Sequence, residues 1–185
     1  VSPEENRPGW RRILLDLVET VLLSVVLFLG INAVSSRIRV ESISMQPTLY
    51  AGNYVLVNKL AYRWGSPSRG DVIVFHYPPD PEQVPYIKRV IGLPGDRIQI
   101  ADGKVRINGQ VLDEPYLKVA TAQGGEWVVP ERSLFVMGDN RNNSSDSRSW
   151  GMVPFENIIG KALVVYWPPS QWGLLNFPIA VAAEP

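Results

Sequence analysis

Two serines lie two positions apart in the stretch ESISMQPTL, residues 41–49. A serine hydroxyl becomes an effective nucleophile only when a neighbouring base removes its proton. The usual base is histidine, and the chain has one, His76, in the run VIVFHYP. This run is typical of a β-strand, so we interpret His76 as a half-buried strand residue whose ring is satisfied locally. A different base is therefore needed if Ser42 or Ser44 attacks a substrate.

A neutral lysine can serve as that base. A free lysine has a pKa of about 10.4, so burial must lower this pKa by several units before the amine is uncharged near pH 7. Lys88 lies inside YIKRVIGL, residues 86–93. Strand alternation places Lys88 on one face with Tyr86 and Val90, and Arg89 on the other face. Periodicity leaves open which of the two cations points inward and which reaches water.

The composition argues against several other kinds of chemistry. The 185-residue chain is long enough to bury a core, and it lacks cysteine, so it has no thiol nucleophile, disulfide or thiolate metal site. Its 18 basic and 18 acidic residues cancel, whereas a nucleic-acid binder normally has a basic surface. The polar run at 139–149 has Arg141 and Ser144 where an EF-hand loop needs an acid or Asn and then Gly. We expect no metal, no cofactor and no nucleic-acid partner.

An apolar run lies near the start of the sequence. A helix over residues 13–34 would be about 33 Å long, enough to cross the core of a bilayer. The run is too long for a cleaved signal peptide, carries Asp16 and Glu19, and ends in AVSSRIRV, which favours an uncleaved anchor. We expect residues 1–12 to be a cytoplasmic tail and residues 13–36 to be a transmembrane anchor. Arginines on both sides of the run code its orientation only weakly.

The sequence after residue 36 has short β-rich segments separated by Gly and Pro. The predicted strands are residues 54–60, 71–77, 86–93, 133–137 and 161–167. The clearest hairpin is DRIQIADGKVRINGQ, with a turn at Asp102-Gly103. The predicted fold is mostly β: an antiparallel β-barrel or sheet over residues 37–168, followed by a C-terminal tail over 169–185.

Four segments follow one another behind the apolar run: SISMQPTL, RGDVIVF, YIKRVIGLPGD and MGDNRNNSSDSRSWGMVP. In order and spacing they resemble the boxes of the type I signal peptidases of bacteria and plastids, from the anchor to about Val165. The resemblance implies a membrane-bound serine endopeptidase with a Ser–Lys dyad on an all-β scaffold. Such an enzyme removes N-terminal signal peptides from exported precursor proteins and cuts after small residues, in the pattern Ala-X-Ala.

The resemblance also assigns the reacting groups. Ser44, before Met45, matches the nucleophile, and Lys88 of the YIKR box matches the general base. Ser42 matches a hydroxyl that forms the oxyanion hole together with the backbone N–H of Ser44. Val40 and Ile87, with Tyr86, are the expected lining of the substrate pocket.

The last box carries supporting roles in this family. Ser144 matches the hydroxyl that orients the lysine, and Asp146 and Arg148 match an ion pair that holds the loop. The chain has Asn142 where many members carry Asp, which puts any charge network through this position in doubt.

The resemblance implies a single-pass protein of the plasma or thylakoid membrane, with its N-terminus in the cytoplasm and its catalytic domain on the outer, periplasmic or lumenal side. Its expected partners are precursor proteins, the lipid bilayer and possible secretion machinery. The tail Ala180-Val181-Ala182 itself has the form of a cleavage site, although a tail of small residues explains it as well. Side chains that either touch the membrane interface or pack on the domain are Trp167, Trp172, Leu174 and Phe177.

Two other functions fit parts of the pattern. A self-cleaving repressor-type protease uses the same Ser–Lys logic, but it would need a DNA-binding module or a built-in scissile segment, and a membrane anchor argues against it. A tethered β-domain used only for binding would need no reactive lysine. Cleavage of an Ala-X-Ala peptide separates these alternatives.

Overall fold

The computed structural model describes residues 9–175 and residue 179, and the chain divides into two units, residues 1–35 and 36–185. The first unit contains helix α1, Trp10–Val34, none of whose residues is buried. An 18-residue window of this helix has a mean hydropathy of 2.3, so α1 is long and apolar enough to cross a membrane by length and composition. Its two hydroxyls at Thr20 and Ser24 donate to helix carbonyls at 2.7 Å, which leaves no polar group on them unsatisfied.

The helix ends where Ser35 adopts an extended backbone and its hydroxyl donates to the carbonyl of Ile31 at 2.8 Å. The apolar segment predicted from residue 13 therefore begins as a helix at Trp10 and stops at Val34. The boundaries predicted for the tail, anchor and peptidase domain remain predictions.

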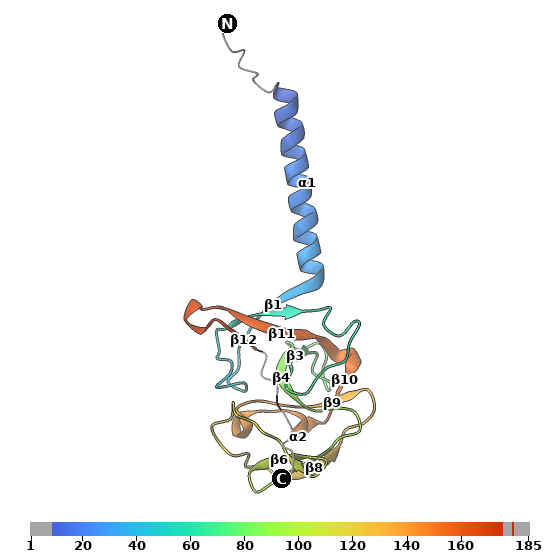
Figure 1. The fold of residues 1–185 in the computed structure, drawn as a ribbon, viewed down its shortest axis with the longest axis vertical. Coiled ribbons are helices and arrows are strands. Elements are labelled where there is room, and N and C mark those ends of the chain that lie inside the picture. Colours follow the sequence, from blue (N-terminus) through green and yellow to red (C-terminus); the bar gives the residue numbers. More distant parts are fainter. Residues whose placement is uncertain (1–8, 176–178, 180–185) are drawn as a thin grey trace. The chain divides into compact units, whose positions relative to one another are not determined.

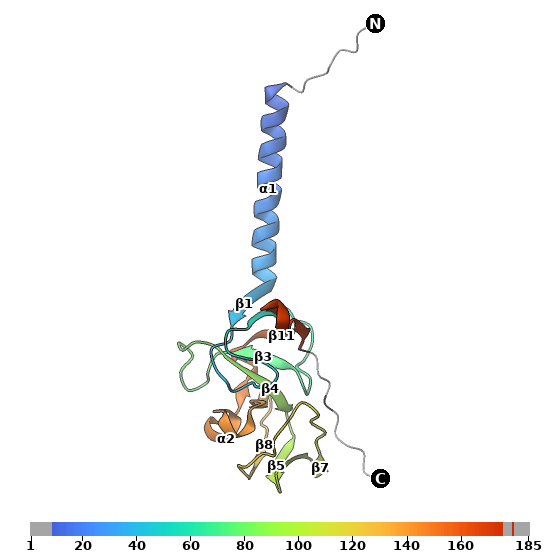
Figure 2. The same ribbon diagram turned by 90° about the vertical axis from the view of Figure 1, so that its left-hand side faces the viewer.

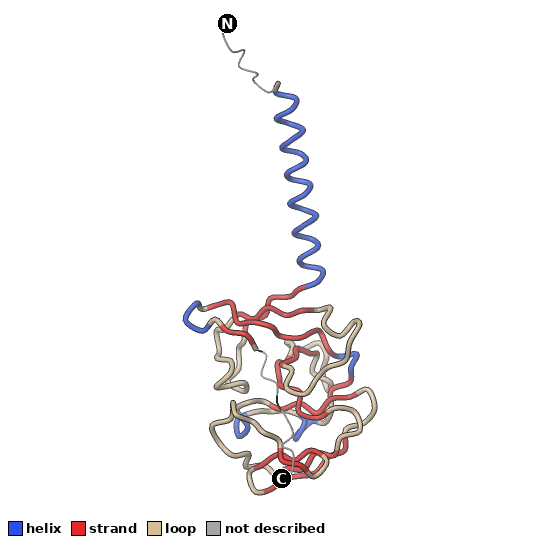
Figure 3. Tube along the Cα trace, viewed as in Figure 1, coloured by secondary structure: helices blue, strands red, loops and turns tan. Residues whose placement is uncertain are grey.

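The second unit consists of short strands and loops (Figures 1 and 3). Its larger sheet has the order β1-β2-β11-β3-β4-β9-β10, with β12 paired to β11, and its smaller sheet has the order β7-β6-β5-β8. The strands are β1 Ser35–Arg39, β2 Tyr54–Asn58, β3 Val72–Phe75, β4 Tyr86–Gly92, β5 Arg97–Ala101, β6 Lys104–Ile107, β7 Gln110–Val111, β8 Gly125–Val128, β9 Ser133–Met137, β10 Val153–Pro154, β11 Ile158–Trp167 and β12 Gly173–Leu174. The short helices are η1 Arg141–Asn143, α2 Ser147–Trp150, η2 Phe155–Asn157 and η3 Pro169–Gln171.

All strand pairs from β2 onward are antiparallel, so the predicted mostly β, antiparallel class is confirmed. The five predicted strands correspond to β2, β3, β4, β9 and β11, although β11 already begins at Ile158. The predicted hairpin is β5–β6, and its turn residues Asp102 and Gly103 have φ of 52° and 75°, as a tight hairpin turn requires. Within the β domain, Figures 1 and 2 place the small sheet at one end and β1 and β11 at the other.

Strand β4 is buried on both faces, which explains why alternation could not choose between its two cations. Ile87 belongs to one apolar cluster with Val40 and Met45, whereas Val90 belongs to a second cluster beside β3. Ile91 belongs to a third cluster, which covers the small sheet. Both cations of the YIKR segment are therefore enclosed by the fold.

The prediction of a half-buried, mid-strand position for His76 is wrong. Strand β3 ends at Phe75, and His76 is exposed. Its ring is satisfied locally, as predicted, because Nδ1 lies 3.1 Å from the carbonyl oxygen of Pro81.

The C-terminal segment predicted as a tail contributes structure to the domain. Strand β12 pairs with β11, and Leu175 is buried in the cluster that contains Val40. The exposed fractions of Trp167, Trp172 and Leu174 are 54%, 68% and 74%, so these side chains do not pack into the domain. Phe177 and the Ala180-Val181-Ala182 motif lie outside the described residues.

Candidate active site

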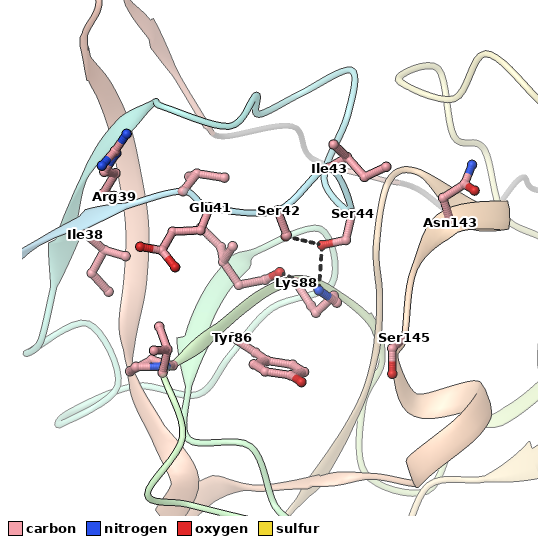
Figure 4. A pocket seen from close by; sticks show the side chains of 14 residues that line it. Ile38, Arg39, Glu41, Ser42, Ile43, Ser44, Tyr86, Lys88, Asn143 and Ser145 are labelled. Carbon is pink, nitrogen blue, oxygen red and sulfur yellow. Dashed lines mark hydrogen bonds between the residues drawn. The ribbon is translucent and has the colours of Figure 1, made fainter.

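The structure brings Ser44 and Lys88 together. Lys88 Nζ lies 2.7 Å from Ser44 Oγ and donates a hydrogen bond to the carbonyl oxygen of Ile87 at 3.1 Å. Both side chains are buried, with exposed fractions of 6% for Ser44 and 4% for Lys88. Figure 4 shows the amine and the hydroxyl meeting at one end of a cleft.

Ser44 is held at the start of a tight turn that follows an extended segment. The next residue, Met45, is fully buried, and its carbonyl accepts from the N–H of Leu49 at 2.9 Å, which closes the turn. On the other side, Asn140 donates its backbone N–H to the Ser44 carbonyl at 2.9 Å and its side-chain amide to the Ile43 carbonyl at 3.2 Å. The loop that follows β9 therefore fixes the backbone of the serine.

Lys88 is held in the middle of β4, where it pairs with Ile73 of β3. Burial lowers the pKa of its amine to about 8, although the carboxylates of Asp146 and Asp139 act in the opposite direction. The ring of Tyr86 lies 5.4 Å from Nζ and stacks on Tyr77 with centroids 4.6 Å apart. The fold thus keeps a lysine amine dry enough to lose its proton near pH 8, well below its ordinary range.

Ser42 lies beside the dyad on the cleft side. Its Oγ is 3.1 Å from Ser44 Oγ, and the residue is exposed. A hydroxyl in this position can donate to an oxygen that forms on a carbonyl attacked by Ser44.

Asp146 and Arg148 form a buried ion pair in the loop after β9. Both guanidinium contacts are short: Nε to Oδ1 and Nη2 to Oδ2 are each 2.8 Å. Asp146 also accepts from the N–H of Gly138 at 3.0 Å, and Arg148 donates to the carbonyl of Arg141 at 2.6 Å. The pair therefore closes the loop onto the end of β9.

No hydrogen bond joins Ser144 to Lys88 in the described chain. Ser144 Oγ is buried and has no hydrogen-bond partner among the described residues. It packs against Gly138, and a Cβ added at position 138 would meet both the Ser144 hydroxyl and the carbonyl oxygen of Ser44. Gly138 thus separates Ser144 from the turn that begins at Ser44.

A cleft of about 350 Å³ opens beside the dyad. Val40, Tyr86 and Ile87, the three residues predicted to line a substrate pocket, all line it. Its walls are the segment before Ser44 and the start of β4, as Figure 4 shows. The other lining residues are Ile38, Arg39, Glu41, Ser42, Ile43, Ser44, Val84, Pro85, Lys88, Asn143 and Ser145.

Comparison with known proteins identifies the family of this chain. A family model described as signal peptidase, peptidase S26, matches residues 14–167. The chain belongs to the signal peptidase family. It is 44% identical to a signal peptidase I of Leptolyngbya laminosa over 186 residues, covering 96% of this chain and 91% of the relative.

Other members of the signal peptidase family are also similar. A chloroplastic thylakoidal processing peptidase of Arabidopsis thaliana is 35% identical, covering 76% of this chain and 44% of the relative. A crystal structure of a signal peptidase I from Enterococcus faecalis aligns at 33% identity and TM-score 0.48, covering 52% of this chain and 96% of that one.

Two buried charged contacts of this signal peptidase family member were not foreseen from its sequence. Arg89 contacts Asp139 at 2.8 Å and 2.6 Å, and its guanidinium carbon lies 4.1 Å from the ring centroid of Tyr116. Arg141 contacts Glu114, and its guanidinium carbon lies 6.0 Å from the centroid of the same ring. The sequence contained a weak signal for the first contact, because Arg89 directly follows Lys88 within a strand. The partner acids, Asp139 and Glu114, each lie in a later loop.

Asn142 stands where many members of the family carry Asp. It makes two hydrogen bonds to backbone groups rather than a contact with a charged side chain. Its side-chain oxygen accepts from the N–H of Ala122 at 2.9 Å, and its amide donates to the carbonyl of Ala120 at 3.1 Å. It therefore joins the loop of Ser144 to the segment before β8. Among the described residues, no group of three or more His, Asp or Glu side chains is placed to hold a metal ion.

Proposed function

We propose that this chain cleaves signal peptides from precursor proteins, with Ser44 as nucleophile and Lys88 as general base. The observation that carries the proposal is the 2.7 Å separation of Lys88 Nζ and Ser44 Oγ, with both groups buried. His76 cannot replace the lysine in this arrangement, because its ring is exposed and bonded to the Pro81 carbonyl.

The reaction proceeds in two halves. Neutral Lys88 removes the proton of Ser44, and Ser44 Oγ attacks the carbonyl carbon at the end of the signal peptide. The C–N bond then breaks as the Lys88 ammonium donates its proton to the leaving amine, which becomes the new N-terminus. A water molecule, deprotonated by Lys88, attacks the acyl-enzyme, and the Ser44 oxygen leaves with a proton returned from Lys88.

The negative oxygen formed in each half needs donors. We assign this role to the Ser42 hydroxyl and the backbone N–H of Ser44, as the family resemblance implies. The support is the position of Ser42 Oγ, which is 3.1 Å from the nucleophile and on the cleft side.

Small side chains before the cut suit the cleft. Val40 and Ile87 are buried apolar residues that line it, and Tyr86 closes it next to the lysine. We assign to them the recognition of the two small residues of the Ala-X-Ala pattern. We assign to Ser144, Asp146 and Arg148 the support of the loop behind Lys88. The Ser144 hydroxyl has no hydrogen-bond partner among the described residues, and Asp146 and Arg148 form a buried ion pair.

Helix α1 anchors the enzyme in our proposal. We place residues before the helix in the cytoplasm and the β domain on the outer, periplasmic or lumenal side, in a plasma or thylakoid membrane. Three arginines before the apolar run and two after it support this orientation slightly. The bilayer is then a permanent partner, and contact with secretion machinery is a possible addition.

The decisive experiment uses the detergent-purified chain and a peptide with an Ala-X-Ala site. Cleavage should be lost in both Ser44→Ala and Lys88→Ala and retained in His76→Ala. Retained cleavage in Lys88→Ala would refute the dyad. The absence of any cleavage by the wild-type chain would instead favour a tethered binding domain.

A further inference from the structure

The cleft beside the dyad contains a carboxylate that the mechanism does not use. Glu41 lines the cleft, is exposed, and lies three residues before Ser44. It makes no hydrogen bond or ion pair with any other described residue. In Figure 4 its carboxylate extends from the segment before Ser44 into the space facing Tyr86, whereas the Arg39 guanidinium lies on the other side of that segment.

The ends of the cleft differ in character, which fixes the direction of a bound substrate. In Figure 4 the apolar Ile38 lies on the side of the cleft away from the dyad, whereas the polar Asn143 and Ser145 lie beyond the dyad. A signal peptide has small residues at the first and third positions before the cut and an apolar region further upstream, so the chain before the cut fits the side of Ile38. The chain after the cut then leaves past the two polar residues.

Glu41 lies on the side of the residues before the cut. An extended chain advances about 3.3 Å per residue, so a substrate alongside the segment 41–44 has its second to fourth residues before the cut level with Glu41. Side chains of an extended chain alternate in direction. When the first and third substrate residues before the cut face Val40 and Ile87, the second and fourth face the rim of the cleft, where the Glu41 carboxylate lies.

We propose that Glu41 forms a subsite for a cationic side chain, lysine or arginine, at the second or fourth substrate residue before the cut. The inference rests on the proposed function, because it needs Ser44 to mark the cut. An acidic side chain in the same place is disfavoured, since it meets a like charge. The effect is moderate because the carboxylate is exposed to water.

The test compares peptides that differ only in Lys, Gln or Glu at the second residue before the cut, and a second series varied at the fourth. For one of the two series, kcat/KM should be about three- to fivefold higher for Lys than for Glu at low salt. The difference should lie mainly in KM, and it should shrink as salt screens the exposed charges.

Glu41→Gln should abolish the ranking, so that this variant cleaves the Lys, Gln and Glu peptides at similar rates. The matched control, Arg39→Gln, removes a neighbouring charge of the same segment and should keep the preference for Lys. Equal cleavage of all peptides by the wild-type chain, or an unchanged ranking in Glu41→Gln, overturns the subsite and leaves the dyad untouched. Failure to cut even the neutral peptide counts against the proposed function itself.

Discussion

The Gly138 backbone packs directly between the Ser44 carbonyl and the Ser144 hydroxyl, so that a Cβ at position 138 would collide with both. Its own N–H donates to Asp146 at 3.0 Å. One glycine thus joins the turn that begins at Ser44 to the loop that carries Ser144 and Asp146, and it does so by close approach rather than by unusual backbone angles.

This packing predicts a strong effect of Gly138→Ala. The added methyl group must displace backbone atoms of the serine turn, so we expect a loss of about 1–3 kcal/mol in the free energy of unfolding and a fall in kcat. Urea unfolding and peptide cleavage measure the two effects. Gly65→Ala is the matched control, because its nearest neighbour would be the Ala61 carbonyl oxygen at an ordinary 3.7 Å. Equal losses of stability and kcat in the two variants would show that the contact of Gly138 with the Ser44 carbonyl is not tight.

The lowered pKa of Lys88 predicts the pH dependence of cleavage. Only the uncharged amine can accept the Ser44 proton, so kcat/KM should rise with pH and level off above about 8, the pKa of Lys88. The expected slope of its logarithm below that value is one. His76→Ala should give the same profile, because the histidine ring is bonded elsewhere. A flat rate between pH 6 and 9 would contradict the role of the lysine.

Arg148 should control that pKa through Asp146. The Asp146 carboxylate raises the pKa of Lys88, and Arg148 offsets its charge at 2.8 Å. Arg148→Gln leaves the carboxylate uncompensated, so the midpoint of the pH profile should move to higher pH, and breaking the buried pair should cost about 3–5 kcal/mol of stability. Arg148→Lys keeps the charge and should leave the midpoint closer to that of the wild type. Profiles are compared at a temperature where circular dichroism shows each variant folded, and an unshifted midpoint in folded Arg148→Gln would refute the coupling.

Much of the fold followed from the sequence because its signals are local. The Asp102-Gly103 turn and the alternation around it predicted β5–β6, and the apolar run predicted α1. The choice between Lys88 and Arg89 did not follow from alternation, because β4 is covered on both faces. Only the resemblance to a family singled out Lys88.

Features set by distant contacts could not be predicted. The pairing of β12 with β11 depends on a two-residue strand with no periodic pattern, and the position of His76 depends on where β3 stops. The contact between Arg141 and Glu114 joins residues 27 positions apart across two loops. Such contacts are visible only when the three-dimensional arrangement is known.

Because the ammonium group of Lys88 is buried, we expect Lys88 to lower the free energy of unfolding of the domain. Its pKa is about 8 in the folded chain, against an ordinary value of 10.5, so the unfolded chain binds more protons between these two values. Stability should therefore rise with pH through this window, and the penalty is complete below pH 8, where the lysine is protonated in both states. Lys88→Met, which removes the amine and keeps most of the stem, should raise the free energy of unfolding by about 1–3 kcal/mol at pH 7 and by much less near pH 10.5.

Chemical denaturation of the wild-type chain and Lys88→Met across this pH range measures the difference. The matched control is Lys104→Met, since Lys104 is an exposed residue of β6 and its removal should not change the pH dependence. A gain that is the same at pH 7 and pH 10.5 would mean that methionine simply packs better. A gain confined to the lower pH would show that the lost stability comes from desolvation of the Lys88 ammonium. The same desolvation lowers the pKa of Lys88, so one free-energy cost would account for both the weaker fold and the basic amine.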